Sequence, residues 1–201
     1  ATSEAKKLIS SIDNVENATA ESLLREGVLK ALTNDSSALK SVEKALELDP
    51  KMLKAELLLA HMAIKSGDIA KAQHIATKWQ QQYPDKADGY NIAAIIELSR
   101  RNVSAATRLL EKSLSVEANN VYALVQLSQL EHSQGKTVNA ESYIKQALAA
   151  APDNINVLRQ YYRLIPGASS LATLKEKSDQ NTDNISYRLL YAEALMKSEQ
   201  L

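Results

Sequence analysis

A 34-residue spacing recurs along this chain of 201 residues. One 34-residue interval separates Pro50 from Pro84 and two separate Pro84 from Pro152, so only Ala118 interrupts the series. A second series with the same spacing consists of Ala38, Ala72, Ala106 and Ala140. A fixed period of this size indicates an array of small units that stack on one another. It argues against a single closed domain.

The composition favours helices and limits the kinds of partner. Alanine and leucine dominate, whereas the chain has only 5 glycines, 4 prolines and no phenylalanine. Such a balance suits helices and leaves little material for a sheet. Lysine plus arginine equals aspartate plus glutamate, 24 each. A nucleic-acid-binding protein would normally carry a basic excess, so we expect no nucleic-acid partner.

The lack of cysteine and of long apolar runs excludes several kinds of site. There is no cysteine, which excludes disulfides, thiolate metal sites and a cysteine nucleophile. No run of 18 apolar residues occurs, so we expect no direct membrane insertion by this segment.

The 34-residue period divides the chain into repeats of two helices, helix A and helix B. In the best-defined repeat, Gly67 suits the left-handed residue that ends helix A, and Asp68 can cap helix B. Pro84 follows helix B, where it cannot extend a helix. The expected units are helix B of a preceding repeat at 1–18, complete repeats at 19–52, 53–86, 87–120 and 121–154, a degenerate repeat at 155–184, and helix A of a further repeat at 185–201.

The unit resembles the tetratricopeptide repeat, a helix–turn–helix of about 34 residues. That family favours a small residue at position 8, glycine at 15, alanine at 20 and 27, and proline at 32. Position 8 here is Ala60, Ala94 and Ser128; position 15 is Gly67, Arg101 and Gly135; position 27 is Ala45, Trp79, Ser113 and Ala147. The resemblance covers about residues 19–154. It implies an all-α fold, a right-handed superhelical α-solenoid of antiparallel helix pairs.

Several departures from the pattern carry predictions of their own. Trp79 replaces a small residue while Ala76 replaces a large one on the same helix face, which we interpret as a volume swap. The alternative is a tryptophan presented to a ligand. A one-residue slip is expected within helix A of the first complete repeat.

The degenerate repeat has its own expected geometry. Pro166 should end its helix A at about Ile165, and a short helix over Ser170–Lys177 should follow. Leu171 and Leu174 should point inward from that helix. In the last expected helix, Ala192 is assigned near position 8.

No catalytic constellation is apparent. The histidines are His61, His74 and His132, and none lies in a metal-binding motif. Glu97 and Glu131 occupy equivalent positions of successive A helices, which is compatible with an acid/base pair or with two solvated carboxylates. We favour the second interpretation and expect neither enzymatic activity nor a cofactor or metal.

The resemblance also implies where a partner binds. In that family helix A lines a concave groove, which suits an extended peptide or a partner helix. The corresponding residues are Lys54, Leu57, His61, Lys65, Asp88, Asn91, Ile95, Tyr122, Val125, Gln129, His132, Arg159 and Arg163. Arg159 and Arg163 lie one helical turn apart and could grip a carboxylate or phosphate, or could be a solvated pair.

We therefore expect a non-catalytic protein–protein interaction scaffold that binds a protein or peptide in this groove. The alternatives are a self-assembly module, through apolar ends at Leu8, Ile9, Ile12, Leu189, Leu190 and Leu195, and the targeting module of a larger enzyme. The stretch LLLAHMAIKSGDIAKAQ is similar to units of long bacterial tetratricopeptide-repeat proteins. Some of these are lipoproteins of envelope polysaccharide export and PEP-CTERM protein sorting. That similarity favours a segment of a longer bacterial protein, in the periplasm or envelope rather than the cytoplasm.

Overall fold

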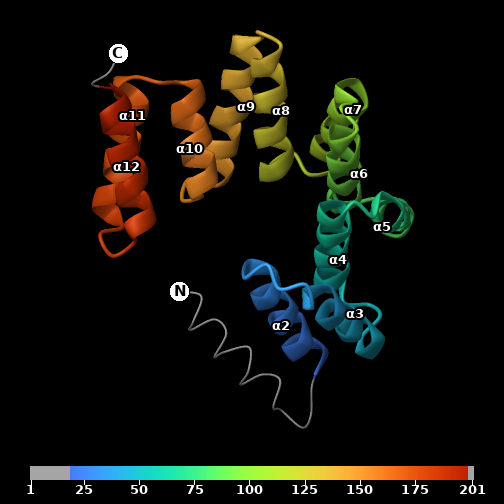
Figure 1. Ribbon diagram of the computed structural model, residues 1–201. Helices are drawn as coiled ribbons and strands as arrows, with labels where there is room; N and C mark the ends of the chain where they lie inside the picture. Colours follow the sequence, from blue (N-terminus) through green and yellow to red (C-terminus); the bar gives the residue numbers. More distant parts are fainter. Residues whose placement is uncertain (1–18, 199–201) are drawn as a thin grey trace. The chain divides into compact units, whose positions relative to one another are not determined.

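The computed structural model describes residues 19–198, which form eleven α-helices and no β-strand (Figure 1). The helices are α2 (Ala20–Leu32), α3 (Ala38–Leu48), α4 (Leu53–Ser66), α5 (Ile69–Gln82), α6 (Asp88–Ser99), α7 (Val103–Val116), α8 (Val121–Ser133), α9 (Thr137–Ala150), α10 (Ile155–Leu164), α11 (Ala168–Gln180) and α12 (Ile185–Ser198). The fold is an all-α solenoid of helix pairs, as predicted. The repeat boundaries and the right-handed superhelix stay predictions, and the helix expected at 1–18 lies outside the described residues.

These helices form two compact parts, α2 to α5 and α6 to α12, with the boundary between Tyr83 and Pro84. Within each part, even-numbered helices occupy helix A positions and odd-numbered helices occupy helix B positions. Partners in a pair are joined by short turns, which makes them antiparallel neighbours. In Figure 1 this is clearest for α8 and α9, which lie side by side.

The turn between helix A and helix B depends on one residue in the left-handed conformation. Gly67 has φ 83° and Gly135 has φ 76°, which confirms the prediction for Gly67. Asp68 caps α5 by accepting a backbone N–H at 3.0 Å, also as predicted. Arg101 adopts φ 61° in the equivalent turn, although a side chain there costs about 1–2 kcal/mol. The packing of α6 against α7 therefore imposes the turn on an unfavourable residue.

The one-residue slip lies in the turn after α2 and not within the helix. Asn34 is the left-handed residue of this turn, with φ 54°. The interval from Asn34 to Gly67 is one residue shorter than the 34-residue intervals from Gly67 to Arg101 and from Arg101 to Gly135. Ala38 nevertheless keeps the 34-residue spacing, so the segment between Asn34 and Ala38 is one residue shorter than its counterparts.

Helices cross where side chains are small. Ala60, Ala94 and Ser128 are completely enclosed, as are the alanines of the 34-residue series to within 2% exposure. At Gly27 the approach is closer still, because a Cβ atom there would lie 2.6 Å from Cγ2 of Val42. The enclosure of these small residues and the close contact at Gly27 indicate that neighbouring helices approach closely at these positions.

Each of the first four pairs also contains a buried polar contact from helix A to helix B. The acceptor residues are only 5–9% exposed: Glu26, Glu56, Asn91 and Glu131. The bonds are Ser41 Oγ to Glu26 Oε1 (2.6 Å), Trp79 Nε1 to Glu56 Oε2 (2.8 Å), Ser113 Oγ to Asn91 Oδ1 (2.8 Å) and Asn139 Nδ2 to Glu131 Oε2 (2.8 Å). The three carboxylates also pair with Lys30, Lys78 and Lys136. Burying these charges is tolerable because they are paired and hydrogen-bonded.

These contacts decide two expectations. Trp79 is 1% exposed, so it belongs to the core, and a tryptophan presented to a ligand is excluded. Glu131 is buried, so the expectation of a solvated carboxylate is wrong for this residue. Glu97 is half-buried and accepts hydrogen bonds from Arg100 and Asn102. Both glutamates are therefore engaged at the turns that follow their helices.

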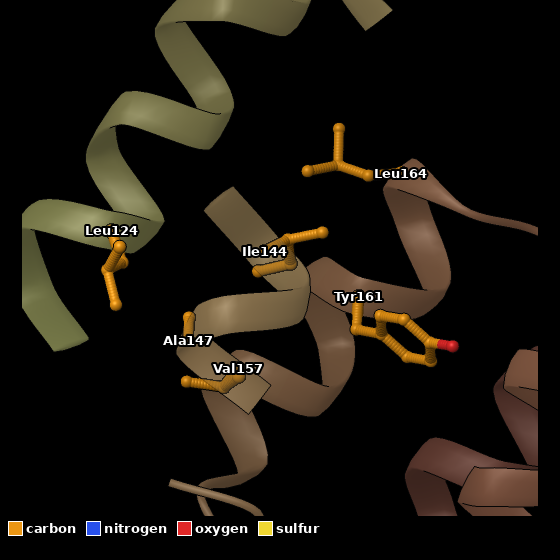
Figure 2. Packing of buried hydrophobic residues seen from close by; sticks show 6 residues of the cluster. All are labelled: Leu124, Ile144, Ala147, Val157, Tyr161 and Leu164. Carbon is orange, nitrogen blue, oxygen red and sulfur yellow. The ribbon is translucent and has the colours of Figure 1, made fainter. Parts of the chain in front are cut away.

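Helices α8, α9 and α10 share one apolar cluster, shown in Figure 2. Its six buried members are Leu124 of α8, Ile144 and Ala147 of α9, and Val157, Tyr161 and Leu164 of α10. A second cluster joins α10 to α11 and α12 through Leu158, Tyr162, Leu174 and Leu190. Helix α10 is therefore held on both sides.

The last helices match the expectations in part. Helix α10 ends at Leu164, with Ile165 as its cap before Pro166. Helix α11 is longer than the predicted Ser170–Lys177, and its Leu174 is buried. The assignment of Ala192 is wrong, because Ala192 is exposed and Ala194 is the small residue that is enclosed.

Replacing Arg101 with glycine should raise the free energy of unfolding by about 0.5–1 kcal/mol, because glycine adopts the left-handed conformation without strain. Gly135→Ala should lower it by about 1 kcal/mol, since a Cβ at Gly135 meets no neighbour within 4 Å and only the backbone is strained. Urea denaturation followed by circular dichroism measures both. Equal effects of the same sign would contradict the explanation.

Candidate functional site

A cavity of about 380 Å³ opens between α10 and α12, two A helices that contact each other. Its polar and apolar lining includes Arg159, Gln160 and Arg163 of α10 and Leu190, Glu193 and Lys197 of α12. Residues four apart on a helix share one face, and this spacing brings both arginines, and on the other helix Glu193 and Lys197, to the cavity. Both arginines that were predicted as site residues therefore line the same cavity.

The wall of the cavity is part of the core. Tyr162 and Leu190 belong to the buried cluster between α10 and α12, and Tyr162 Oη donates a hydrogen bond to the carbonyl oxygen of Ala194 at 2.9 Å. The two helices are therefore fixed relative to each other. The charged side chains stand on a preformed apolar base.

The electrostatics of the cavity favour an anion. Three cationic side chains and one anionic side chain line it, which leaves a net charge of +2. Within residues 19–198, neither Arg159 nor Arg163 forms an ion pair, and both are exposed. Gln160 Oε1 is buried and has no hydrogen-bond donor among the same residues. The site therefore combines unused cations with one unused acceptor.

Sequence reasoning did not identify Gln160, Glu193 or Lys197. Helix α12 begins 30 residues after α10, so the 34-residue spacing does not relate positions on these two helices and gave no signal for Glu193 or Lys197. Gln160 had no signal either.

The other predicted residues of α6 and α8 are less accessible. Asn91 is buried, and both ends of its amide are engaged, by Ser113 Oγ and by Asn120 Oδ1 at 3.1 Å. Half-buried side chains make up most of the remainder: Asp88, Ile95, Tyr122, Val125 and Gln129, with His132 exposed. Their contact with a partner stays a prediction.

In the N-terminal part, the predicted residues lie on α4. Lys54, His61 and Lys65 are exposed, and Leu57 is half-buried. Lys65 Nζ donates to Asn34 Oδ1 at 3.0 Å, beside a cavity of about 400 Å³ that α4 shares with the α2–α3 turn. His61 Nδ1 lies 2.9 Å from the carbonyl oxygen of Leu57, on its own helix.

Comparisons with known proteins agree with this architecture. Sequence models of the tetratricopeptide repeat match residues 36–96 and 121–154. No curated protein sequence gives a match. The thermophilic protein TTC0263 of Thermus thermophilus has a similar structure, with 22% identity, a TM-score of 0.68 and coverage of 89% of this chain and 100% of that chain.

Two further structures are similar at lower identity. PilF of Pseudomonas aeruginosa has 17% identity, a TM-score of 0.58 and coverage of 96% of this chain and 90% of that chain. A chain from the APC/C hetero-tetramer Cut9–Hcn1 has 14% identity, a TM-score of 0.65 and coverage of 98% of this chain and 40% of that chain. At these identities the likeness concerns the fold alone.

The helix pairs and their surface define an α-solenoid of the kind that serves as a protein-interaction scaffold. The chain belongs to the tetratricopeptide-repeat superfamily, whose members are generally non-catalytic. Residues 19–198 contain no cluster of three side chains suited to a metal ion. None of the helices in that range is long and apolar enough to cross a membrane. The absence of enzymatic activity stays a prediction.

Tyr122 provides a test of how tightly its face of α8 is packed. Burial raises the pKa of Tyr122 from 10 to about 12. The folded chain holds this proton more tightly than the unfolded chain, so the stability it supports is complete below pH 10 and is lost as the pH rises towards 12. Between pH 9.5 and 11.5, the free energy of unfolding of the wild type should fall by about 2 kcal/mol more than that of Tyr122→Phe.

Urea denaturation at the two pH values measures this difference. The absorbance of tyrosinate at 295 nm, compared between wild type and Tyr122→Phe, gives the pKa directly. If the difference spectrum titrates at the ordinary value of about 10, the hydroxyl is solvated and the prediction is wrong.

Proposed function

We propose that this chain is a non-catalytic scaffold that binds a peptide or a partner protein along its A helices. The observation that carries the proposal is the cavity between α10 and α12, where two arginines that form no ion pair within residues 19–198 stand on a fixed apolar base. Under this proposal the chain is part of a longer bacterial protein of the periplasm or envelope, as the sequence resemblance implies.

The chemistry of the A helices supports a protein ligand. The predicted groove residues combine apolar groups that are half-buried, such as Leu57 and Val125, with exposed polar groups such as His61 and His132. A surface of alternating apolar and hydrogen-bonding groups suits an extended peptide or an amphipathic helix. A small metabolite would be more fully enclosed than this open surface allows.

Site-specific photocross-linking tests which helices face the partner. A photoreactive benzoyl-phenylalanine is placed at His61 or His132 on A helices, and at His74 or Lys145 on B helices of the same pairs. All four positions are exposed, so the substitutions leave the core intact. In cells that make the full-length protein, cross-linked products should form at His61 and His132 and be weaker by about tenfold or more at the B-helix positions.

The B-helix positions are matched controls for exposure and expression. Cross-linking that is strongest at His74 and Lys145 would place the partner on the opposite surface. Equal labelling at all four positions would indicate random collision. Either result contradicts the proposal.

Self-association is a second candidate, favoured by an apolar stripe on α12. Ile185, Leu189 and Met196 are 66%, 56% and 59% exposed, and their spacing places them on one helix face. Leu190, which the sequence assigned to this surface, is instead buried. Light scattering should show a dimer that Leu189→Lys converts to a monomer, since burying a lysine in an apolar interface is unfavourable. A wild-type monomer at about 100 μM would eliminate this candidate.

A further inference from the structure

The two arginines of the α10–α12 cavity are spaced to match alternate side chains of an extended peptide. Arg159 and Arg163 are four residues apart on α10, which places their Cβ atoms about 5–6 Å from each other. In an extended chain, side chains i and i+2 point to the same face and are about 6.6 Å apart. Adjacent side chains of such a chain point to opposite faces and cannot reach both arginines.

The charge of the cavity matches two carboxylates. Its net charge is +2, and each guanidinium can bind one carboxylate through two parallel hydrogen bonds. A phosphate monoester would concentrate about 1.5 to 2 negative charges at one point, whereas two carboxylates place one charge beside each guanidinium. Glu193 on the opposite wall also disfavours such a concentrated charge.

Gln160 lies between the two arginines in sequence. Within residues 19–198 its side-chain amide oxygen lacks a hydrogen-bond donor, which a ligand could supply. Its Oε1 atom is buried without a hydrogen-bond partner among the described residues. The backbone N–H groups of an extended peptide are donors of the required kind. Because Oε1 is buried in the unbound chain, this hydrogen bond requires the side chains that cover it to move when the peptide binds.

We infer that the cavity between α10 and α12 binds an extended segment of a partner protein with two acidic side chains separated by one residue. Arg159 and Arg163 each hold one carboxylate, and Gln160 accepts a backbone N–H of the segment. Lys197 strengthens the attraction from the opposite wall, while Tyr162 and Leu190 contact the aliphatic parts. This inference rests on the proposed function and names the ligand chemistry for one of its surfaces.

Three short peptides of matched length test the spacing. All have acetylated and amidated ends, so no terminal charge contributes. The first carries Glu-Thr-Glu between serines, the second Glu-Glu-Thr, and the third Gln-Thr-Gln. Binding is measured by isothermal titration calorimetry at low salt, where ionic contacts are strongest. The first peptide should bind at least about threefold more tightly than the second, and the third should bind least.

Variants identify the groups responsible. Arg163→Gln should reduce the first peptide to the affinity of the second, because only one guanidinium then remains. Gln160→Met, which lacks the acceptor, should weaken both acidic peptides by a similar factor. Arg188→Gln should change neither, since Arg188 is an exposed arginine of α12 that does not line the cavity. Circular dichroism confirms that each variant is folded.

The outcomes separate this inference from the proposed function. Equal affinity of the two acidic peptides, no binding of any peptide, or competition by inorganic phosphate at lower concentration than the first peptide would overturn the inference. Cross-linking at the A helices would still support the scaffold in those cases. Loss of the spacing preference in Arg163→Gln, with the preference kept in Arg188→Gln, would establish it.

Discussion

Close approach of neighbouring helices is the constraint on which this structure depends. The enclosed Ala60, Ala94 and Ser128, and the complete absence of a side chain at Gly27, let one helix rest almost directly on the next. Larger residues then fill the space on either side, as Trp79 does where Ala76 leaves room. In the first four pairs, the absence of a large side chain at this one position therefore determines the packing as much as the large residues around it do.

Features that repeat with the chain could be predicted from the sequence, and features that occur once could not. The small residues, Gly67 and the cap at Asp68 follow the 34-residue spacing, and the structure confirms them. The buried hydrogen bonds follow the period only in part: Trp79 and Ser113 are both donors at position 27, whereas Ser41 and Asn139 are donors at other positions. Each such bond depends on three-dimensional distances that a one-dimensional pattern does not contain. For the same reason Ala192 was assigned where Ala194 is enclosed.

In the candidate site, too, some residues could be predicted from the sequence and others could not. Arg159 and Arg163 were identified because the family resemblance assigns both to the groove side of helix A, and local spacing places them one helical turn apart. Glu193 and Lys197 required knowledge that α10 and α12 face each other, and Gln160 required the burial of one particular atom. Asn91 matched the family's groove position, yet its amide is used inside the repeat. Position in a repeat therefore predicts the surface on which a residue lies better than it predicts the bonds of that residue.

The hydrogen bond from Tyr162 to the carbonyl oxygen of Ala194 makes the cavity wall and the last helix one structural unit. A ligand that bridges α10 and α12 can bind only while these helices are packed, so binding and folding of helices α10 to α12 are thermodynamically linked. At a free concentration of one hundred times Kd, such a ligand adds about 2.7 kcal/mol to the free energy of unfolding. Binding of the partner would then raise the melting temperature of these helices without any change in their backbone conformation.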